Sequence, residues 1–214
     1  MHRGRFMFKD RFEAGRLLAK ALEAYRGTDA IVLAIPRGAL QIGQVLHEEL
    51  GLPLDIMVTK KIPHPMSEEF AIGAVGPEGE YFVDIQAARD VSPLYIDAQR
   101  KKLASLVEEK YERYRGRRPK PKLRGKTVII VDDGIATGST MLAAIHVIKK
   151  QKPAKIVVAV PVGPSAAIRR MREETNEVVC LLIPDFFFAI GAFYGDFPQV
   201  EDEEAIDILR KCQS

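Results

Sequence analysis

The stretch Val128-Ile129-Ile130-Val131-Asp132-Asp133-Gly134-Ile135-Ala136-Thr137-Gly138-Ser139-Thr140 predicts a buried strand, a tight turn and the start of a helix. Its four aliphatic residues in a row are typical of a strand covered on both faces, as in a parallel sheet. Two carboxylates stand at the carboxyl end of that strand, before two glycines and three hydroxyl residues. Open α/β sheets bind ligands beyond the carboxyl ends of their strands, so we expect a ligand site here.

The composition of this turn suits a phosphate group and a set of sugar hydroxyls together. The first N–H groups of a helix lack intrahelical acceptors and the helix dipole is positive there, so an anion binds well. Gly138 lets the backbone approach a phosphate closely, and hydroxyl donors are added by Thr137, Ser139 and Thr140. Adjacent carboxylates accept hydrogen bonds from hydroxyls or hold a hydrated Mg²⁺. The stretch therefore predicts a site for a ribose 5-phosphate.

Three other kinds of site do not fit the sequence. A P-loop requires Gly-x₄-Gly-Lys, and the turn contains no lysine. A dinucleotide site requires Gly-x-Gly-x-x-Gly between a strand and a helix, and the chain has no such pattern. A phospho-receiver domain carries a further Asp at the end of a later strand, whereas residues 155–160 are followed by Pro161.

The remainder of the chain alternates Val- and Ile-rich runs with helical patterns, which predicts a three-layer α/β/α fold with a mostly parallel, doubly wound sheet. Strands are expected at residues 30–35, 54–59, 127–131, 155–160 and 178–183. Helices are expected at residues 10–24, 38–50, 93–115 (capped by Ser92), 138–150 and 164–174. The runs 71–75 and 81–85 flank a turn and are expected to pair as a hairpin.

The quoted stretch resembles the fingerprint of the type I phosphoribosyltransferase family, in which four apolar residues, two acids and a turn ending in Thr-Gly-x-Thr follow one another. The resemblance implies that Asp132 and Asp133 bind the ribose 2- and 3-hydroxyls and, through water or the ribose, Mg²⁺. The residues implied to wrap the 5-phosphate are Ala136, Thr137, Gly138, Ser139 and Thr140. Hypoxanthine–guanine enzymes carry an Asp where this chain has Ala136, so that substrate class is not expected.

Two further segments agree with the resemblance. Pro36-Arg37-Gly38-Ala39 follows the first strand, where the family has a pyrophosphate-binding loop. Thr59-Lys60-Lys61 follows the second, where the family usually has a basic pair before a mobile loop. Arg37, Lys60 and Lys61 would then neutralise the diphosphate leaving group, and Lys61 joins the two acids as a catalytic residue. Glu68 or Glu69 of that loop could act as the base for the acceptor, although each, taken alone, is better interpreted as an exposed loop acid.

The resemblance implies transfer of a phosphoribosyl group from Mg²⁺-phosphoribosyl pyrophosphate to a nitrogen acceptor, which we expect to be a nucleobase. The alternative is a regulator that binds phosphoribosyl pyrophosphate or a nucleotide without turnover and associates with RNA. Residues 113–126 hold eight Lys/Arg and no acid, so the rest of the chain carries net charge −5. This run contains Pro119 and Pro121 and few aromatics, so we interpret it as a solvated connector and do not expect nucleic-acid binding. A structural subunit with a vestigial site is a third possibility.

Residues 186–214 are expected to form a small C-terminal aromatic cap on a core at about 28–185, both within one domain spanning residues 1–214. Five of the ten phenylalanines fall between Phe186 and Phe197, with Tyr194 among them. Such rings could form the hood over the acceptor, where they would stack on a flat heterocycle. They could equally seal the edge of the sheet or a contact between subunits, so a homodimer is kept open.

Composition bounds the remaining expectations. A chain of 214 residues with 47% hydrophobic residues and net charge +3 is typical of a globular protein. No apolar run reaches the roughly 20 residues of a membrane span, and no apolar signal core follows the basic N-terminus, so a cytoplasmic location is expected. Cys180 and Cys212 are expected to be small hydrophobic thiols, with a nucleophile or a disulfide as the alternative for either.

Overall fold

A parallel five-stranded sheet forms the centre of the computed structural model, which describes residues 8–116 and 118–212. The strands lie in the order β2 (Leu54–Ile56), β1 (Ile31–Ala34), β6 (Thr127–Val131), β7 (Lys155–Val162) and β8 (Glu177–Leu182). In this order β2 lies next to β1 towards one edge of the sheet, and β6, β7 and β8 follow β1 towards the other edge. The strand order therefore reverses between β1 and β6. The predicted α/β class with a doubly wound parallel sheet is confirmed.

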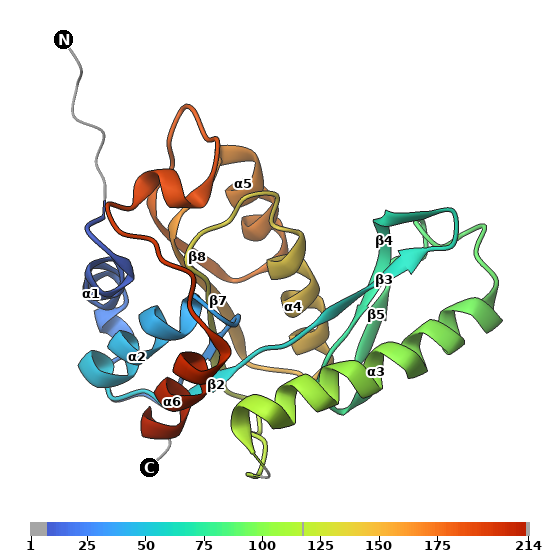
Figure 1. Cartoon of the computed structure of the whole chain (residues 1–214), viewed down its shortest axis with the longest axis horizontal. Helices are drawn as coiled ribbons and strands as arrows, with labels where there is room; N and C mark the ends of the chain where they lie inside the picture. Colours follow the sequence, from blue (N-terminus) through green and yellow to red (C-terminus); the bar gives the residue numbers. More distant parts are fainter. Residues whose placement is uncertain (1–7, 117, 213–214) are drawn as a thin grey trace.

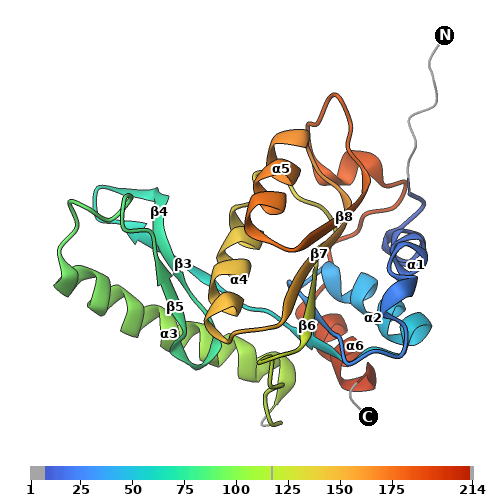
Figure 2. The same cartoon turned by 180° about the vertical axis from the view of Figure 1, so that it is seen from behind.

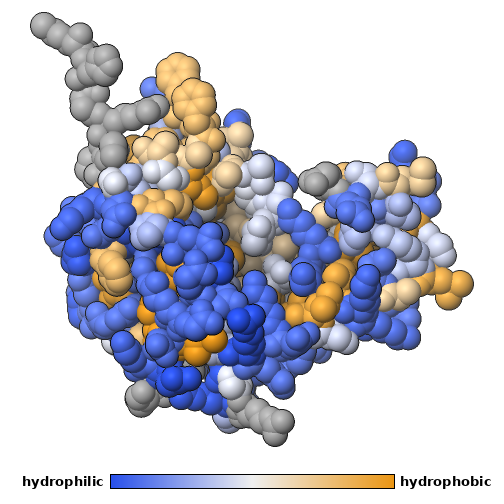
Figure 3. Space-filling model, viewed as in Figure 1, coloured by the Kyte–Doolittle hydropathy of each residue, from blue (hydrophilic) through white to orange (hydrophobic). Residues whose placement is uncertain are grey.

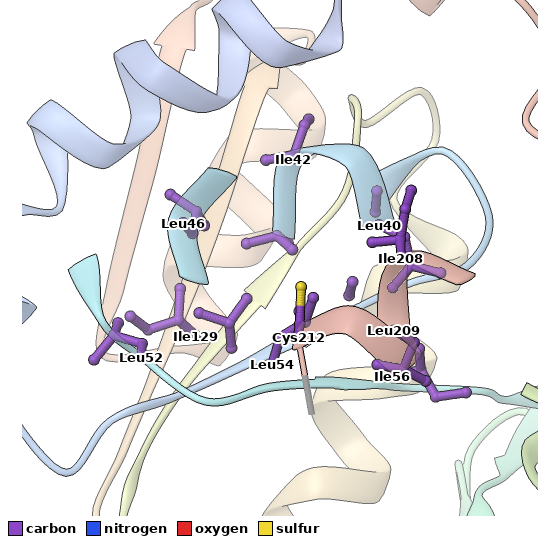
Figure 4. Close-up of a cluster of buried hydrophobic side chains, with 14 of the residues drawn as sticks. Leu40, Ile42, Leu46, Leu52, Leu54, Ile56, Ile129, Ile208, Leu209 and Cys212 are labelled. Carbon is purple, nitrogen blue, oxygen red and sulfur yellow. The ribbon is translucent and has the colours of Figure 1, made fainter. Parts of the chain in front are cut away.

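Helices cover both faces of this sheet (Figures 1 and 2). One face is covered by α1 (Arg11–Ala21), α2 (Ala39–Leu50) and α6 (Asp202–Cys212), and the other by α4 (Ser139–Lys150) and α5 (Ser165–Glu174). Strand alternation explains the two cores, because successive side chains point to opposite faces. Ile129 of β6 packs with Leu40 and Ile42 of α2, whereas Ile130 packs on the other side with Met141 of α4. Figure 4 shows the first of these cores.

The chain between β2 and β6 forms a projecting unit, which we call the arm (Figure 1). Its antiparallel sheet has the order β3 (Lys60–His64), β4 (Ser67–Val75), β5 (Tyr81–Val83), and the long helix α3 (Pro93–Arg115) packs on one face of it. The expected hairpin is confirmed, with Gly73 opposite Val83 and Val75 opposite Tyr81. The remaining short elements are the 3₁₀ turns η1 (Glu23–Tyr25), η2 (Pro77–Gly79) and η3 (Ile190–Phe193).

Three expectations about these elements are wrong. The second strand ends at Ile56, and residues 60–64, expected to lead into a mobile loop, form strand β3. Ile62 accounts for strand β3, because its side chain is fully buried under α3 while the adjacent residues Lys61 and Pro63 are more exposed. Pro63 is tolerated since β3 is an edge strand. Ser92 precedes α3 but its side chain makes no capping hydrogen bond.

The described residues contain no helix that is long and apolar enough to cross a membrane. The basic N-terminal residues 1–7 and Arg117 of the basic run lie outside the described residues. Cys212 is buried at the end of α6, and Cys180 is half-buried in β8, where burial raises the pKa of its thiol to about 11. Both thiols are free, so neither is in a disulfide, and a raised pKa disfavours the reactive thiolate of Cys180.

Candidate functional site

Two loops meet where the strand order reverses. Residues 36–38 follow β1 and residues 132–140, here called the 132–140 turn, follow β6. The strands are in register at Ala34 and Val131, so both loops leave the sheet at the same level. A Cβ on Gly38 would lie 2.2 Å from Asp133 Oδ2, which leaves room there for glycine alone. The Pro36–Arg37 peptide bond is cis.

The 132–140 turn encloses a small cavity at the start of α4. The turn is fixed to the neighbouring strand by a 2.8 Å hydrogen bond from Ile135 N–H to the Val162 carbonyl. Gly138 has φ +79°, a left-handed conformation that favours glycine, and the helix begins at the next residue. The cavity has a volume of about 150 Å³ and is lined by Asp132, Gly134, Ile135, Ala136, Thr137, Gly138, Ser139, Thr140, Met141 and Ile190. Its size, hydroxyls and helix N-terminus suit a phosphate group.

The two acids of the turn have different surroundings. Asp132 lines the cavity, and its Oδ1 accepts a 2.8 Å hydrogen bond from Asp133 N–H. Asp133 Oδ2 accepts a 2.8 Å hydrogen bond from Arg11 Nε, and its backbone carbonyl accepts one of 2.7 Å from the Tyr194 hydroxyl. Asp132 is thus the acid that faces the cavity, while the described contacts of the Asp133 carboxylate are directed to Arg11.

Burial raises the pKa of both carboxyls. The pKa of Asp132 lies well above its ordinary value, because burial and the charge of Asp133 both disfavour its ionised form. Burial raises the pKa of Asp133 too, and Arg11 partly opposes this. Bound hydroxyl donors or a cation would restore the favourable ionised form of Asp132.

The donor set fits a magnesium ion that arrives with a substrate. Among residues 8–116 and 118–212, no group of three or more His, Cys, Asp or Glu side chains converges to hold a metal ion. Mg²⁺ is usually held by one or two carboxylates together with substrate phosphates and water, and does not need a cage made by protein alone. Asp132 at the cavity supplies one such carboxylate.

Arg11 is a site residue that the sequence did not reveal. Its side chain is only 5% exposed, and besides Asp133 it contacts the Pro198 carbonyl at 2.8 Å and the Phe197 ring at 3.6 Å. It links α1 to the acidic pair and to the C-terminal segment. No sequence signal could have found it, because Arg11 and Asp133 are separated by 122 positions.

The structure places Arg37 against the N-terminus of α6. Its Nη1 lies 3.4 Å from Asp202 Oδ1 and 3.7 Å from Glu201 Oε2. Asp202 also accepts a 2.6 Å hydrogen bond from the Tyr114 hydroxyl and lies 3.0 Å from Arg113 Nη2. The arginine of the loop after β1 is therefore engaged by acids of the C-terminal helix, which a diphosphate would have to displace.

The structure separates the basic pair Lys60 and Lys61. Successive residues of a strand point to opposite faces of the sheet. Lys61 lines a second cavity, of about 170 Å³, together with Ser139 of the 132–140 turn. On the other side, partial burial lowers the pKa of Lys110, and so do three neighbouring cations: Lys60, Arg37 and Arg113. Lys60 thus lies on the face of β3 that α3 covers, near Lys110, whereas Lys61 lies towards the turn.

The two glutamates considered as a base lie in the arm. Glu68 is exposed on β4, in a strand where a mobile loop was expected. The side chain of Glu69 lies outside the described part of the structure. No contact of the described residues joins Glu68 to the 132–140 turn, so the base for an acceptor is not identified by the fold.

Charges of the basic run 113–126 are used inside the protein. Arg115 is buried and pairs with Asp55 at 2.7 Å, while Lys120 lies 2.7 Å from Glu108. Arg115 also donates to two backbone carbonyls, those of Arg118 and Pro119. These contacts fix the connector between α3 and β6, in agreement with its interpretation as a connector, but the expectation that it is solvated is wrong at Arg115, which is buried against Asp55.

The aromatic segment divides into core and surface. Phe193 is 2% and Tyr194 is 4% exposed, and both pack with Phe8. These two rings therefore cannot stack on an acceptor, contrary to the expectation for them, because the core already covers their faces. Phe186 is 76% and Phe188 82% exposed on the loop after β8. Hydrophobic side chains project at the top of Figure 3, where this loop rises in Figure 1.

Comparisons with known proteins agree with this geometry. The family model for the phosphoribosyl transferase domain matches residues 9–197. Rv0571c of Mycobacterium tuberculosis, provisionally named a phosphoribosyl transferase, is 37% identical over 208 residues, which are 96% of this chain and 47% of that protein. The ribose-phosphate pyrophosphokinase of Pyrococcus furiosus is 30% identical over 152 residues, 60% of this chain and 53% of that protein. The chain spans about half the length of the curated relatives it matches.

A solved structure matches nearly the whole chain. The crystal structure of TT1426 from Thermus thermophilus superposes with a TM-score of 0.89 at 38% sequence identity. The match covers 96% of this chain and 98% of that chain, so the arm and the C-terminal segment are included in the similarity.

Proposed function

The chain belongs to the phosphoribosyl transferase family, and we propose that it transfers a phosphoribosyl group from Mg²⁺-phosphoribosyl pyrophosphate to a nitrogen acceptor, releasing pyrophosphate. One observation carries the proposal. The cavity of the 132–140 turn contains a helix N-terminus with hydroxyls and the carboxylate of Asp132, so a phosphate and sugar hydroxyls find complementary groups side by side.

In this proposal the substrate spans the two loops at the reversal of strand order. The 5-phosphate lies on residues 136–140, and the ribose hydroxyls donate hydrogen bonds to Asp132. The diphosphate then extends towards residues 36–38 and the side chain of Arg37; Lys60, like Arg37, lies near Lys110. Asp132 would also hold the Mg²⁺ that the diphosphate brings, and the ion would neutralise charge on the departing pyrophosphate.

The reaction exchanges one bond at ribose C1 for another. The C1–O bond to pyrophosphate breaks as a C1–N bond to the acceptor forms, and the acceptor nitrogen loses its proton. The sugar becomes oxocarbenium-like, so the protein accelerates the step mainly by fixing the reactants and by placing charge. Asp132 orients the ribose through its hydroxyls, and Arg37 stabilises negative charge on the leaving group. A nucleobase is the acceptor we propose.

The contacts of the basic run favour this proposal over an RNA-associated regulator. Arg115 and Lys120 have buried or partly buried acidic partners, so two of the charges that could bind RNA are committed to the fold. A cytoplasmic location and a homodimer stay predictions.

Release of pyrophosphate from phosphoribosyl pyrophosphate, measured across a panel of nucleobases and simple amines, tests the proposed function. We expect release that requires Mg²⁺, depends on one class of acceptor and disappears in Asp132→Asn. Absence of release with every acceptor, despite tight binding of phosphoribosyl pyrophosphate, would favour a regulator instead.

A further inference from the structure

The 132–140 turn provides a phosphate site without a cation. Residues 134–140 contain no Lys or Arg, and the two residues before them are acids. Amide and hydroxyl donors can hold a phosphate, but a doubly charged 5-phosphate beside two carboxylates would experience repulsion. A cation close to the turn would offset that repulsion.

A second cavity adjoins the turn and contains two such cations. Its volume is about 170 Å³, and it lies between the arm and α4, in the hollow that Figure 3 shows between arm and body. Ser139 lines both this cavity and that of the 132–140 turn. The side chains that matter for charge are Lys61, Asp84, His146 and Arg170.

Lys61 reaches this cavity because of the register of β3. Ile62 points into the core of the arm, so Lys61 points to the opposite face, which is turned towards α4. The arm approaches α4 closely, since a Cβ on Gly76 would lie 2.2 Å from Val147. Small residues at Ala71 and Gly73 leave the cavity open in front of Lys61.

Arg170 reaches the cavity from α5. This helix packs on the turn, because a Cβ on Gly138 would lie 2.9 Å from Met171 and 3.8 Å from Ala167. Arg170 adjoins Met171, at helical spacing of three from Ala167, and so lies on the same side. Within residues 8–116 and 118–212, neither Arg170 nor Lys61 takes part in an ion pair with a described carboxylate.

The other two ionisable groups of the cavity are already engaged. His146 lies 3.3 Å from Glu174 and its ring stands 4.0 Å from that of Phe82. Asp84 Oδ1 accepts hydrogen bonds from two backbone N–H groups, those of Gln86 and Ala87. The balance of charge available to a ligand is therefore positive, from Lys61 and Arg170.

We propose that Lys61 and Arg170 supply the positive charge for the 5-phosphate of a substrate held on the 132–140 turn. Lys61 then serves the opposite end of the substrate from Lys60, which lies on the face of β3 that α3 covers, near Lys110 of that helix. The basic pair is divided between the two phosphate groups and does not act together on the diphosphate. This inference rests on the proposed function, because it takes the turn as the 5-phosphate site.

The two halves of the substrate test this division separately. Titration calorimetry with ribose 5-phosphate and with Mg²⁺-pyrophosphate is carried out on Lys61→Met, Lys60→Met and Arg170→Met. We expect Lys61→Met and Arg170→Met each to weaken binding of ribose 5-phosphate by roughly fivefold or more, the effect of one unit charge about 4 Å away in water. Both should leave pyrophosphate affinity unchanged. Lys60→Met should instead weaken binding of pyrophosphate and leave the affinity for ribose 5-phosphate unchanged. Arg169→Met is the matched control, because it removes the same charge from an exposed position of α5 that does not line the cavity.

Each alternative result is distinguishable. Unchanged ribose 5-phosphate affinity in Lys61→Met and Arg170→Met, or an equal loss in Arg169→Met, would overturn the inference while leaving the proposed function in place. Loss of pyrophosphate affinity in Lys61→Met would show that this lysine binds the diphosphate leaving group and not the 5-phosphate. Failure of the wild-type protein to bind either fragment or phosphoribosyl pyrophosphate would remove the proposed function and the inference with it. Thermal unfolding of each variant shows that the fold is retained, as expected for exposed side chains.

Discussion

Replacing Arg11 by methionine should unfold the protein at a markedly lower temperature. The two side chains of the Arg11–Asp133 pair are 5% and 14% exposed, so the substitution leaves a buried carboxylate beside a second one. Removing one partner of a buried pair costs about 3–5 kcal/mol. For a chain of this length that corresponds to a fall in Tm of roughly 6–20 °C. Urea and thermal unfolding at neutral pH measure the loss.

Two further measurements separate the ion pair from simple loss of packing. The double variant Arg11→Met/Asp133→Asn should recover most of the stability, because no unpaired charge remains. Arg11 is the group that opposes the raised pKa of Asp133, so that pKa rises further without it. A carboxyl whose pKa is raised in the folded protein lowers the stability of the protein as the pH rises through that pKa. The stability difference between wild type and Arg11→Met should therefore become smaller in acid. A deficit independent of pH, with no recovery in the double variant, would refute the role given to this pair.

Three other substitutions have expected outcomes. Gly38→Ala should cost about 1–3 kcal/mol by overpacking, since its Cβ would lie 2.2 Å from Asp133 Oδ2, and should weaken binding of phosphoribosyl pyrophosphate in calorimetry. Phe193→Ala should cost about 3–5 kcal/mol in urea unfolding, while the exposed Phe188→Ala should change stability by no more than about 0.5 kcal/mol; similar losses in both would contradict the division of the aromatic segment. Arg115→Met should destabilise by about 3–5 kcal/mol because its buried acidic partner is left unpaired, and a neutral effect would show that the connector is solvated throughout.

The central sheet and the turn could be predicted from sequence because their signals are local. Runs such as residues 127–131 are apolar at nearly every position, which only a strand covered on both faces requires. The acids, glycines and hydroxyls of the turn follow within nine positions of one another. Both signals are complete within a short window, so no knowledge of distant contacts was needed.

Strand β3 shows where local signals fail. Its residues include two lysines and a proline, a composition that favours a loop. It is a strand because it pairs with β4 and because Ile62 is buried beneath α3, which lies some thirty residues later in the chain. The same packing of Ile62 places Lys60 on the face of β3 that α3 covers and Lys61 on the face turned towards α4.

The contacts within the acidic pair were likewise beyond the sequence. Nothing in the residues themselves distinguishes Asp132 from Asp133, and the distinction arises from an arginine in the first helix. Tyr194 was expected to face an acceptor because aromatic residues cluster there, yet its hydroxyl donates to the Asp133 carbonyl from within the core. The sequence shows that the aromatic residues are close together along the chain. Which of them are buried depends on the elements that pack over them.

Calorimetric titration of Mg²⁺-phosphoribosyl pyrophosphate into the wild-type protein and into Asp132→Asn tests the central claim most directly. The wild-type protein should bind, and the variant should show no measurable binding because its ligand-facing carboxylate is gone. The variant should unfold at the same temperature as the wild type or higher, since burial disfavours the ionised form of Asp132 in the folded protein. Unchanged affinity in Asp132→Asn, with the fold intact, would contradict the claim that the 132–140 turn holds this substrate.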